Sequence, residues 1–237
     1  MPDARRPATP DEELLGAERP AVASERSDAE RLQRIHDELA TGFHALGGLG
    51  CGVSIFGSAR RPADHPDYAL ARATARRLGE EGFAVITGGG PGIMEAANRG
   101  AREAGATSVG LNIELPHEQG PNAFQDIALR FHYFFTRKLL FVRYATAFVV
   151  FPGGFGTLDE LFEALVLIQT GKIRHFPVVL VRAAFWEGMT AWLRERLAAE
   201  ALVASVDLDL VTATDDPDEV VAIVRRGAER QGLQLAA

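Results

Sequence analysis

Short, continuous apolar runs alternate along this chain with longer segments in which apolar residues recur every three or four positions. The continuous runs are typical of strands buried on both faces of a sheet, and the wider spacing is typical of amphipathic helices. The pattern predicts strands at residues 53–56, 83–87, 108–113, 127–131, 147–151, 177–181 and 208–212. It predicts helices at residues 28–46, 68–81, 93–104, 134–144, 158–169, 184–197 and 217–230.

Repeated strand-then-helix units predict an α/β fold: a single Rossmann-like, doubly wound parallel sheet with helices on both faces. This domain is expected to cover residues 28–237 and to begin with a helix capped by Asp28. Residues 1–27 are polar and proline-bearing without periodicity, which predicts a disordered tail. Ligands of such sheets lie at the carboxyl ends of the strands, where the strand order reverses.

Composition and charge exclude several classes of protein. Four of the seven net negative charges fall in residues 1–30, and the rest of the chain is mildly acidic, which argues against duplex nucleic acid as a partner. No apolar run is long enough to cross a bilayer, and the N-terminus lacks an apolar signal core, so we expect a cytoplasmic protein. A single cysteine, Cys51, predicts neither a disulfide nor a zinc cluster, and we expect no metal.

Two glycine-rich turns, residues 88–92 and 152–157, each join a predicted strand to a predicted helix. Glycine lets backbone N–H groups approach a phosphate closely, and a helix N-terminus attracts the anion. The first turn fits neither the dinucleotide fingerprint nor the P-loop. The end of the first strand supplies a third short turn, so the candidate ligand-binding residues are Gly57, Ser58, Gly88, Gly89, Gly90, Gly92, Pro152, Gly153, Gly154, Gly156 and Thr157.

The sequence allows two interpretations of Glu160. Thr157 and Glu160 form a capping box, in which the glutamate would accept the Thr157 N–H and do nothing else. The other interpretation is a catalytic carboxylate beside the second turn, and the two roles are not exclusive. Glu95, one turn beyond the first glycine turn, can face a base or ribose, although a solvated helix carboxylate is the simpler interpretation.

The predicted helix at residues 134–144 carries three cations among aromatic and apolar residues: Arg137, Lys138 and Arg143. Arg137 and Lys138 cannot both face one direction. Either they extend to the surface, or Arg137 reaches into the site as a fork for a phosphate or carboxylate. Arg143 is a poorer candidate. His117, His132 and Cys51 are expected to be structural or surface residues.

Three segments together resemble the LOG ("Lonely Guy") family of cytokinin-activating enzymes: Gly-Gly-Gly-Pro-Gly-Ile-Met-Glu-Ala at 88–96, Phe-Thr-Arg-Lys at 135–138 and Pro-Gly-Gly-Phe-Gly-Thr-Leu-Asp-Glu at 152–160. The resemblance extends over residues 50–230. Members are often labelled lysine decarboxylases, but no lysine here lies in a recognisable pyridoxal-phosphate motif.

The resemblance implies hydrolysis of the N-glycosidic bond of a nucleoside 5′-monophosphate, AMP or an N6-substituted AMP, without any cofactor. Arg137 and Glu160 would be the catalytic pair, the second turn would hold the phosphate, and residues 88–92 with Met94 and Glu95 would line the ribose and base. Members are usually homodimers. The alternative is a non-catalytic carrier of a nucleotide-like ligand, as in the related molybdenum-cofactor carriers.

Overall fold

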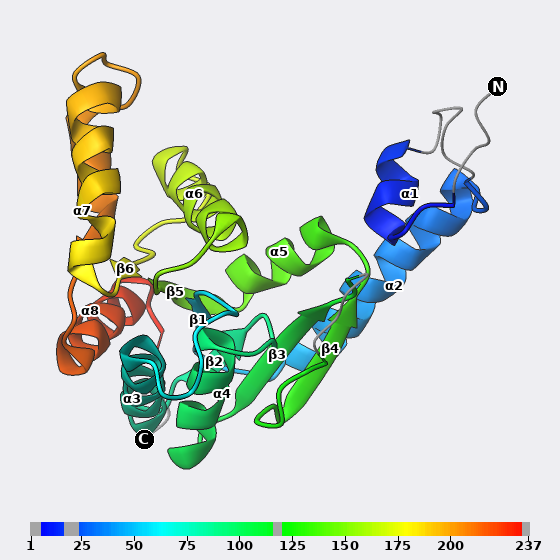
Figure 1. Ribbon diagram of the computed structural model, residues 1–237, viewed down its shortest axis with the longest axis horizontal. Coiled ribbons are helices and arrows are strands. Elements are labelled where there is room, and N and C mark those ends of the chain that lie inside the picture. Colours follow the sequence, from blue (N-terminus) through cyan, green and yellow to red (C-terminus); the bar gives the residue numbers. More distant parts are fainter. Residues whose placement is uncertain (1–5, 17–23, 116–119, 234–237) are drawn as a thin grey trace.

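The computed structural model describes residues 6–16, 24–115 and 120–233. In it, one sheet of seven parallel strands runs through the molecule in the order β4-β3-β2-β1-β5-β6-β7 (Figure 1). The strands are β1 (Gly52–Phe56), β2 (Ala84–Thr87), β3 (Ser108–Ile113), β4 (Ile127–Phe131), β5 (Ala145–Val150), β6 (Val178–Leu180) and β7 (Val211–Ala213). The predicted doubly wound α/β fold is confirmed, and the strand order reverses between β1 and β5.

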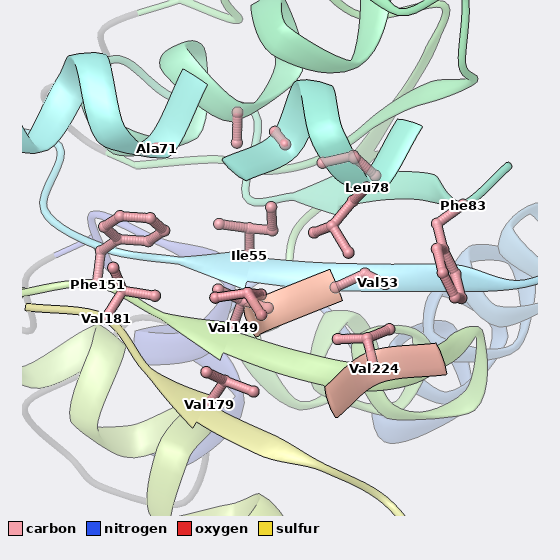
Figure 2. Packing of buried hydrophobic residues seen from close by; sticks show 14 of the residues in the cluster. Val53, Ile55, Ala71, Leu78, Phe83, Val149, Phe151, Val179, Val181 and Val224 are labelled. Carbon is pink, nitrogen blue, oxygen red and sulfur yellow. The ribbon is translucent and has the colours of Figure 1, made fainter. Parts of the chain in front are cut away.

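Helices cover both faces of the sheet (Figure 1). They are α1 (Pro10–Gly16), α2 (Asp28–Leu46), α3 (Pro66–Glu80), α4 (Ile93–Glu103), α5 (Phe134–Arg143), α6 (Phe155–Gln169), α7 (Ala183–Trp192) and α8 (Pro217–Arg230). Successive residues of a strand point to opposite faces, so each buried strand supplies two cores. Val53 and Ile55 of β1 pack under α3, α4 and α8 (Figure 2), whereas Phe56 faces the core beneath α5, α6 and α7.

The N-terminal segment differs from expectation. Residues 10–16 form helix α1, so the predicted disordered tail is wrong there, while residues 1–5 and 17–23 lie outside the described residues. Glu13 fixes this short helix to α2 and to the chain just before it, because its carboxylate lies 2.7 Å from Arg26 Nη1 and 3.7 Å from Arg31 Nη2. The cap of α2 is Ser27, in a capping box with Glu30, rather than Asp28.

Other element boundaries also differ, most of them by one or two residues, and three differences are larger. Helix α6 begins at Phe155, before the predicted start at residue 158. Helix α7 ends at Trp192 and continues as a π-helix, Leu193–Ala198. A 3₁₀ helix, Ser205–Leu210, replaces the first part of the last predicted strand.

His117 lies outside the described residues. Among the helices that the structure describes, none combines the length and apolar character that a membrane span requires.

Candidate active site

The predicted ligand-binding turns meet at the carboxyl ends of β1, β2 and β5. The Phe151 N–H donates to the Phe56 carbonyl (2.8 Å), and the Ser58 N–H donates to the Pro152 carbonyl (3.0 Å). The Ser58 carbonyl in turn accepts the Ile93 N–H (3.1 Å), at the start of α4. The turn after β1 is therefore bonded to both glycine turns, at the place where the strand order reverses and where α/β proteins bind ligands.

A network of side-chain amides fixes the first glycine turn. Gly89 has a φ of +74°, and its carbonyl accepts hydrogen bonds from the Asn122 N–H (2.9 Å) and from Gln125 Nε2 (2.8 Å). A Cβ at Gly89 would overlap Asn112 Oδ1, so glycine is required here for both its conformation and its size. Sequence reasoning missed these amides; the available signal was the proximity of Asn122 and Gln125 in the loop before β4.

Met94 and Arg137 lie against this turn. A Cβ at Gly88 would lie 2.8 Å from Met94 Sδ and 3.7 Å from Arg137 Nη1, so both side chains approach Gly88. Met94 also covers Gly90, where a Cβ would lie 2.8 Å from Met94 Cε. Glu95 is held differently, because its Oε1 accepts the Tyr68 hydroxyl (2.8 Å). That a ribose or base contacts Glu95 remains a prediction.

The second glycine turn leads directly into α6, and the capping-box interpretation of Glu160 is wrong. Gly154 is the N-cap, so Gly156 and Thr157 belong to the first helical turn. The Thr157 N–H donates to the Gly154 carbonyl (3.0 Å) and not to the Glu160 carboxylate. A Cβ at Gly153 would overlap the Thr157 hydroxyl, which therefore lies against the turn. Gly154 and Gly156 are exposed, and a Cβ at either would meet nothing within 4 Å.

Glu160 is a buried carboxylate with an oxygen that makes no hydrogen bond. The residue is 3% exposed, and its Oε2 has no hydrogen-bond partner. Lys138 Nζ lies 3.5 Å from that oxygen, close enough for an ion pair but outside hydrogen-bond geometry. Burial raises the pKa of Glu160 to about 7, and the positive charges of Lys138 and Arg137 oppose this rise only in part.

Lys138 joins α5 to three carboxylates of α6. Its Nζ lies 2.9 Å from Asp159 Oδ2 and 3.0 Å from Glu163 Oε2, besides its approach to Glu160. Partial burial alone would lower the pKa of Lys138, but the carboxylates outweigh this effect and raise it. The interpretation in which Lys138 extends into solvent is wrong. Its position next to Arg137 was the only sequence signal for a role in the site.

Arg137 points away from Lys138, as their adjacency on one helix requires. Its guanidinium lies over the rings of Phe134 (5.2 Å) and Phe141 (5.4 Å), and its Nε is buried without a hydrogen-bond partner. Burial lowers the pKa of Arg137, against the opposing charges of Glu160, Asp11 and Asp159. Within the part of the chain that the structure describes, no carboxylate forms an ion pair with Arg137. Arg143 lies over the Phe43 ring (4.6 Å) instead.

The lysines of the chain do not suit pyridoxal phosphate, the cofactor that a lysine decarboxylase would use. That group bonds covalently to a lysine that has lost its proton. The chain has two lysines, Lys138 and Lys172. The three acidic neighbours of Lys138 favour its protonated form, and Lys172 is exposed just beyond the end of α6.

The fold and the position of the two glycine turns define an α/β protein with a candidate ligand site at a topological switch point. The family model described as "Possible lysine decarboxylase" matches residues 94–224. This match covers more than half of the chain, which therefore belongs to that family, the LOG family.

Two proteins that are similar to this chain in sequence are named as enzymes that cleave nucleoside 5′-monophosphates, and a third protein, named as a carrier, shares its fold. The cytokinin riboside 5′-monophosphate phosphoribohydrolase of Mycobacterium marinum is 29% identical over 160 residues, covering 66% of this chain and 85% of that protein. The pyrimidine/purine nucleotide 5′-monophosphate nucleosidase of Escherichia coli (strain K12) is 29% identical over 48% of this chain and 27% of its own. The molybdenum cofactor carrier protein of Chlamydomonas reinhardtii has the same fold, with a TM-score of 0.56, 22% identity and coverage of 76% and 99%.

Proposed function

We propose that the protein hydrolyses the N-glycosidic bond of a nucleoside 5′-monophosphate and releases the free base and ribose 5-phosphate. The observation that supports this most strongly is the buried Glu160 carboxylate, whose Oε2 makes no hydrogen bond. A carrier needs contacts to a phosphate but has no use for such a carboxylate. The names of the relatives from Mycobacterium marinum and Escherichia coli support the same reaction class.

The chemistry matches the residue types. Cleavage of the bond between C1′ and the base nitrogen passes through a cation-like sugar, which a neighbouring carboxylate stabilises. Water adds to C1′, and the base leaves with a proton. We assign to Glu160, in its ionised form, the stabilisation of C1′ or the activation of that water. Gly153, Gly154, Gly156 and Thr157 would hold the 5′-phosphate at the start of α6.

Arg137 completes the proposed catalytic pair as a contact to the substrate. Its guanidinium lies near Gly88 rather than bonded to Glu160, which favours a role in binding the anionic substrate over a role in holding the carboxylate. Lys138 Nζ, 3.5 Å from Glu160 Oε2, is the cation that forms an ion pair with the carboxylate. Met94, against the first turn, would contact the base or ribose side, and AMP or an N6-substituted AMP is the proposed substrate.

The first experiment follows adenine and ribose 5-phosphate released from AMP and isopentenyl-AMP by the wild type and by Glu160→Gln. We expect turnover by the wild type and a loss of at least about a hundredfold in the variant, because the amide carries no charge. Asp159→Asn is the matched control, since it neutralises the neighbouring, exposed carboxylate. A wild type that binds these nucleotides without cleaving them would show the protein to be a carrier.

We also propose a homodimer. Apolar side chains are exposed along α6, on the same side of the molecule as the site, with Phe155 92% and Val166 54% exposed. They border a groove of about 510 Å³ between Phe155 and Leu167. Large exposed apolar patches are typical of protein contacts, and a two-fold axis would let two copies cover the same patch.

A further inference from the structure

A second cluster of charged side chains lies at the carboxyl edge of the sheet. Arg61 belongs to the loop after β1, Asp67 to the first turn of α3, and Arg182 follows β6 directly. β1 and β6 are the two neighbours of β5 in the sheet. The cluster therefore joins the loops on either side of the strand that leads into the second glycine turn.

Asp67 holds both arginines through the same atom of their side chains. The residue is 2% exposed, its Oδ1 lies 3.0 Å from Arg182 Nε, and its Oδ2 lies 3.3 Å from Arg61 Nε. A buried carboxylate stays charged only when cations compensate it. Since two guanidinium groups share this single carboxylate, one positive charge is left over.

The outer nitrogens of both guanidinium groups are free to bind a further group. Among the described residues, the approach to Asp67 is the only side-chain ion pair of Arg61 and of Arg182, and neither side chain makes a hydrogen bond there. Both ion pairs use Nε, so the Nη donors have no partner in this part of the chain. The side chains are 36% and 46% exposed, which leaves these donors accessible from solvent.

His65 adds another donor to the cluster. The Asp67 N–H donates to His65 Nδ1 (3.0 Å), so the ring proton lies on Nε2, which bonds to none of the described residues. Two further acids lie in the same loops but do not compensate the arginines. Asp215 accepts the Ala183 N–H (2.8 Å), and Asp64 forms no ion pair with the described cations.

The backbone at Arg182 has a conformation that arginine rarely adopts. Its φ of +71° and ψ of +62° lie in the left-handed region, which favours glycine. The turn itself therefore gives no reason for an arginine at this position. Residues held in such conformations are typical of functional sites, where the side chain is what the site requires.

We propose that Arg61, His65 and Arg182 form a second anion site, which binds a phosphate group and is distinct from the second glycine turn. Guanidinium groups bind phosphate oxygens through pairs of N–H donors, and the free Nη atoms of two arginines supply several. Asp67 positions both groups from below and leaves the site positively charged. The phosphate is either free in solution or the second phosphate of a nucleotide, since both present the same oxygens.

The test is a backbone ¹H–¹⁵N NMR titration of the full-length protein with inorganic phosphate at constant ionic strength. It follows the proposed site through the amides of residues 61–67 and 182–183, and the second glycine turn through those of residues 153–157. We expect both sets of signals to move, each with its own midpoint.

Three variants show whether the arginines hold the phosphate. Arg61→Gln and Arg182→Gly should each weaken binding at the proposed site by at least about tenfold and leave the signals of the second glycine turn unchanged. Glycine suits the positive φ at position 182, so Arg182→Gly should melt no lower than the wild type, and unfolding would not explain its loss of binding. Arg174→Gln, at an exposed arginine before β6, is the matched control and should titrate as the wild type does.

Two results would overturn the site: signals of residues 61–67 and 182–183 that phosphate does not move, or midpoints that are the same in Arg61→Gln and Arg182→Gly as in the wild type. ADP distinguishes the two sources of the phosphate. One midpoint shared by both sets of signals indicates a nucleotide that spans both sites, and separate midpoints indicate a free phosphate. If phosphate moves only the signals of the proposed site, this site stands, and the phosphate role proposed for the second glycine turn fails.

Discussion

The negative charge of the Glu160 carboxylate is only partly balanced by its two cationic neighbours, Lys138 and Arg137. The Lys138 ammonium forms ion pairs with three carboxylates, and the Arg137 guanidinium lies over two aromatic rings. Neither makes a hydrogen bond to Glu160 Oε2, and the surrounding burial disfavours ionisation. Carboxylates with strongly raised pKa values in such places are typical of functional sites.

The first prediction concerns stability against pH. The pKa of Glu160 is about 7 in the folded protein and near 4.5 when unfolded, so the folded state loses stability as the pH rises from 4.5 through 7. The Glu160→Gln variant does not lose this stability, because its amide does not ionise. We expect it to match the wild type near pH 4.5 and to exceed it by about 2–3 kcal/mol at pH 8, measured by urea unfolding. Glu187→Gln, at an exposed carboxylate, should show no such divergence.

The second prediction concerns Lys138. Its positive charge lowers the pKa of Glu160, so Lys138→Met should raise that pKa and move the rising limb of kcat/KM to higher pH. The control is Lys172→Met, at the only other lysine, which is exposed. A Lys138→Met profile that superimposes on the wild type would show that the ammonium does not act on Glu160.

At the scale of elements, the regular alternation of apolar runs was enough to predict the sheet and most helix cores. The third and fourth strands, residues 108–113 and 127–131, have the predicted bounds because each is a continuous or alternating run with clear breaks. Helix α1 was missed because its stability comes from the bonds of Glu13 to Arg26 and Arg31, which no local pattern contains. The start of α6 was missed because Gly156 lies within the first helical turn, against the low helix propensity of glycine.

The candidate site was predictable only in part. The glycine content of residues 88–92 and 152–157 was enough to predict the two turns, and the apolar residues around Arg137 and Lys138 were enough to single out that pair. Which way each cation points depends on packing between α5 and α6, and the same packing decides that Glu160 is a buried carboxylate rather than a cap. The amides that hold Gly89 come from a loop far along the chain, so only the folded structure shows them.

The third prediction concerns the first glycine turn. Gly89→Ala adds a Cβ at a positive φ and drives it into Asn112, whereas Gly105→Ala meets only the conformational cost, at a φ of +72° with nothing within 4 Å. We expect unfolding free energies to fall by about 1 kcal/mol for Gly105→Ala and about 2–4 kcal/mol for Gly89→Ala. Equal losses would mean that the amide network gives way easily. Nucleotide turnover should disappear only in Gly89→Ala.

At the scale of the whole molecule, the helices on the two faces of the sheet differ in how completely they bury their apolar side chains. The face under α3, α4 and α8 closes over a continuous apolar core (Figure 2). On the other face, α5 and α6 leave Phe135, Leu139, Phe155 and Val166 exposed next to the site. This asymmetry supports the proposed homodimer.

The fourth prediction tests the dimer by sedimentation velocity. Val166→Glu places a charge in the exposed apolar stretch of α6, and we expect a wild type of twice the chain mass and a monomeric variant. Leu32→Glu, at a residue that is 65% exposed on α2, should remain dimeric. A monomeric wild type across the micromolar range would exclude the homodimer.

The reversal of strand order has a consequence for biosynthesis. β5 pairs with β1 along its whole length, although three other strands lie between them in the chain. A ribosome therefore delivers β1 to β4 first, and the growing chain holds an open β1 edge until β5 emerges. The turns after β1 and β5 can bond to each other only once β5 has paired with β1. We therefore expect a nascent chain that ends before β5 to have no nucleotide-cleaving activity. The appearance of that activity during synthesis would then mark the completion of the sheet.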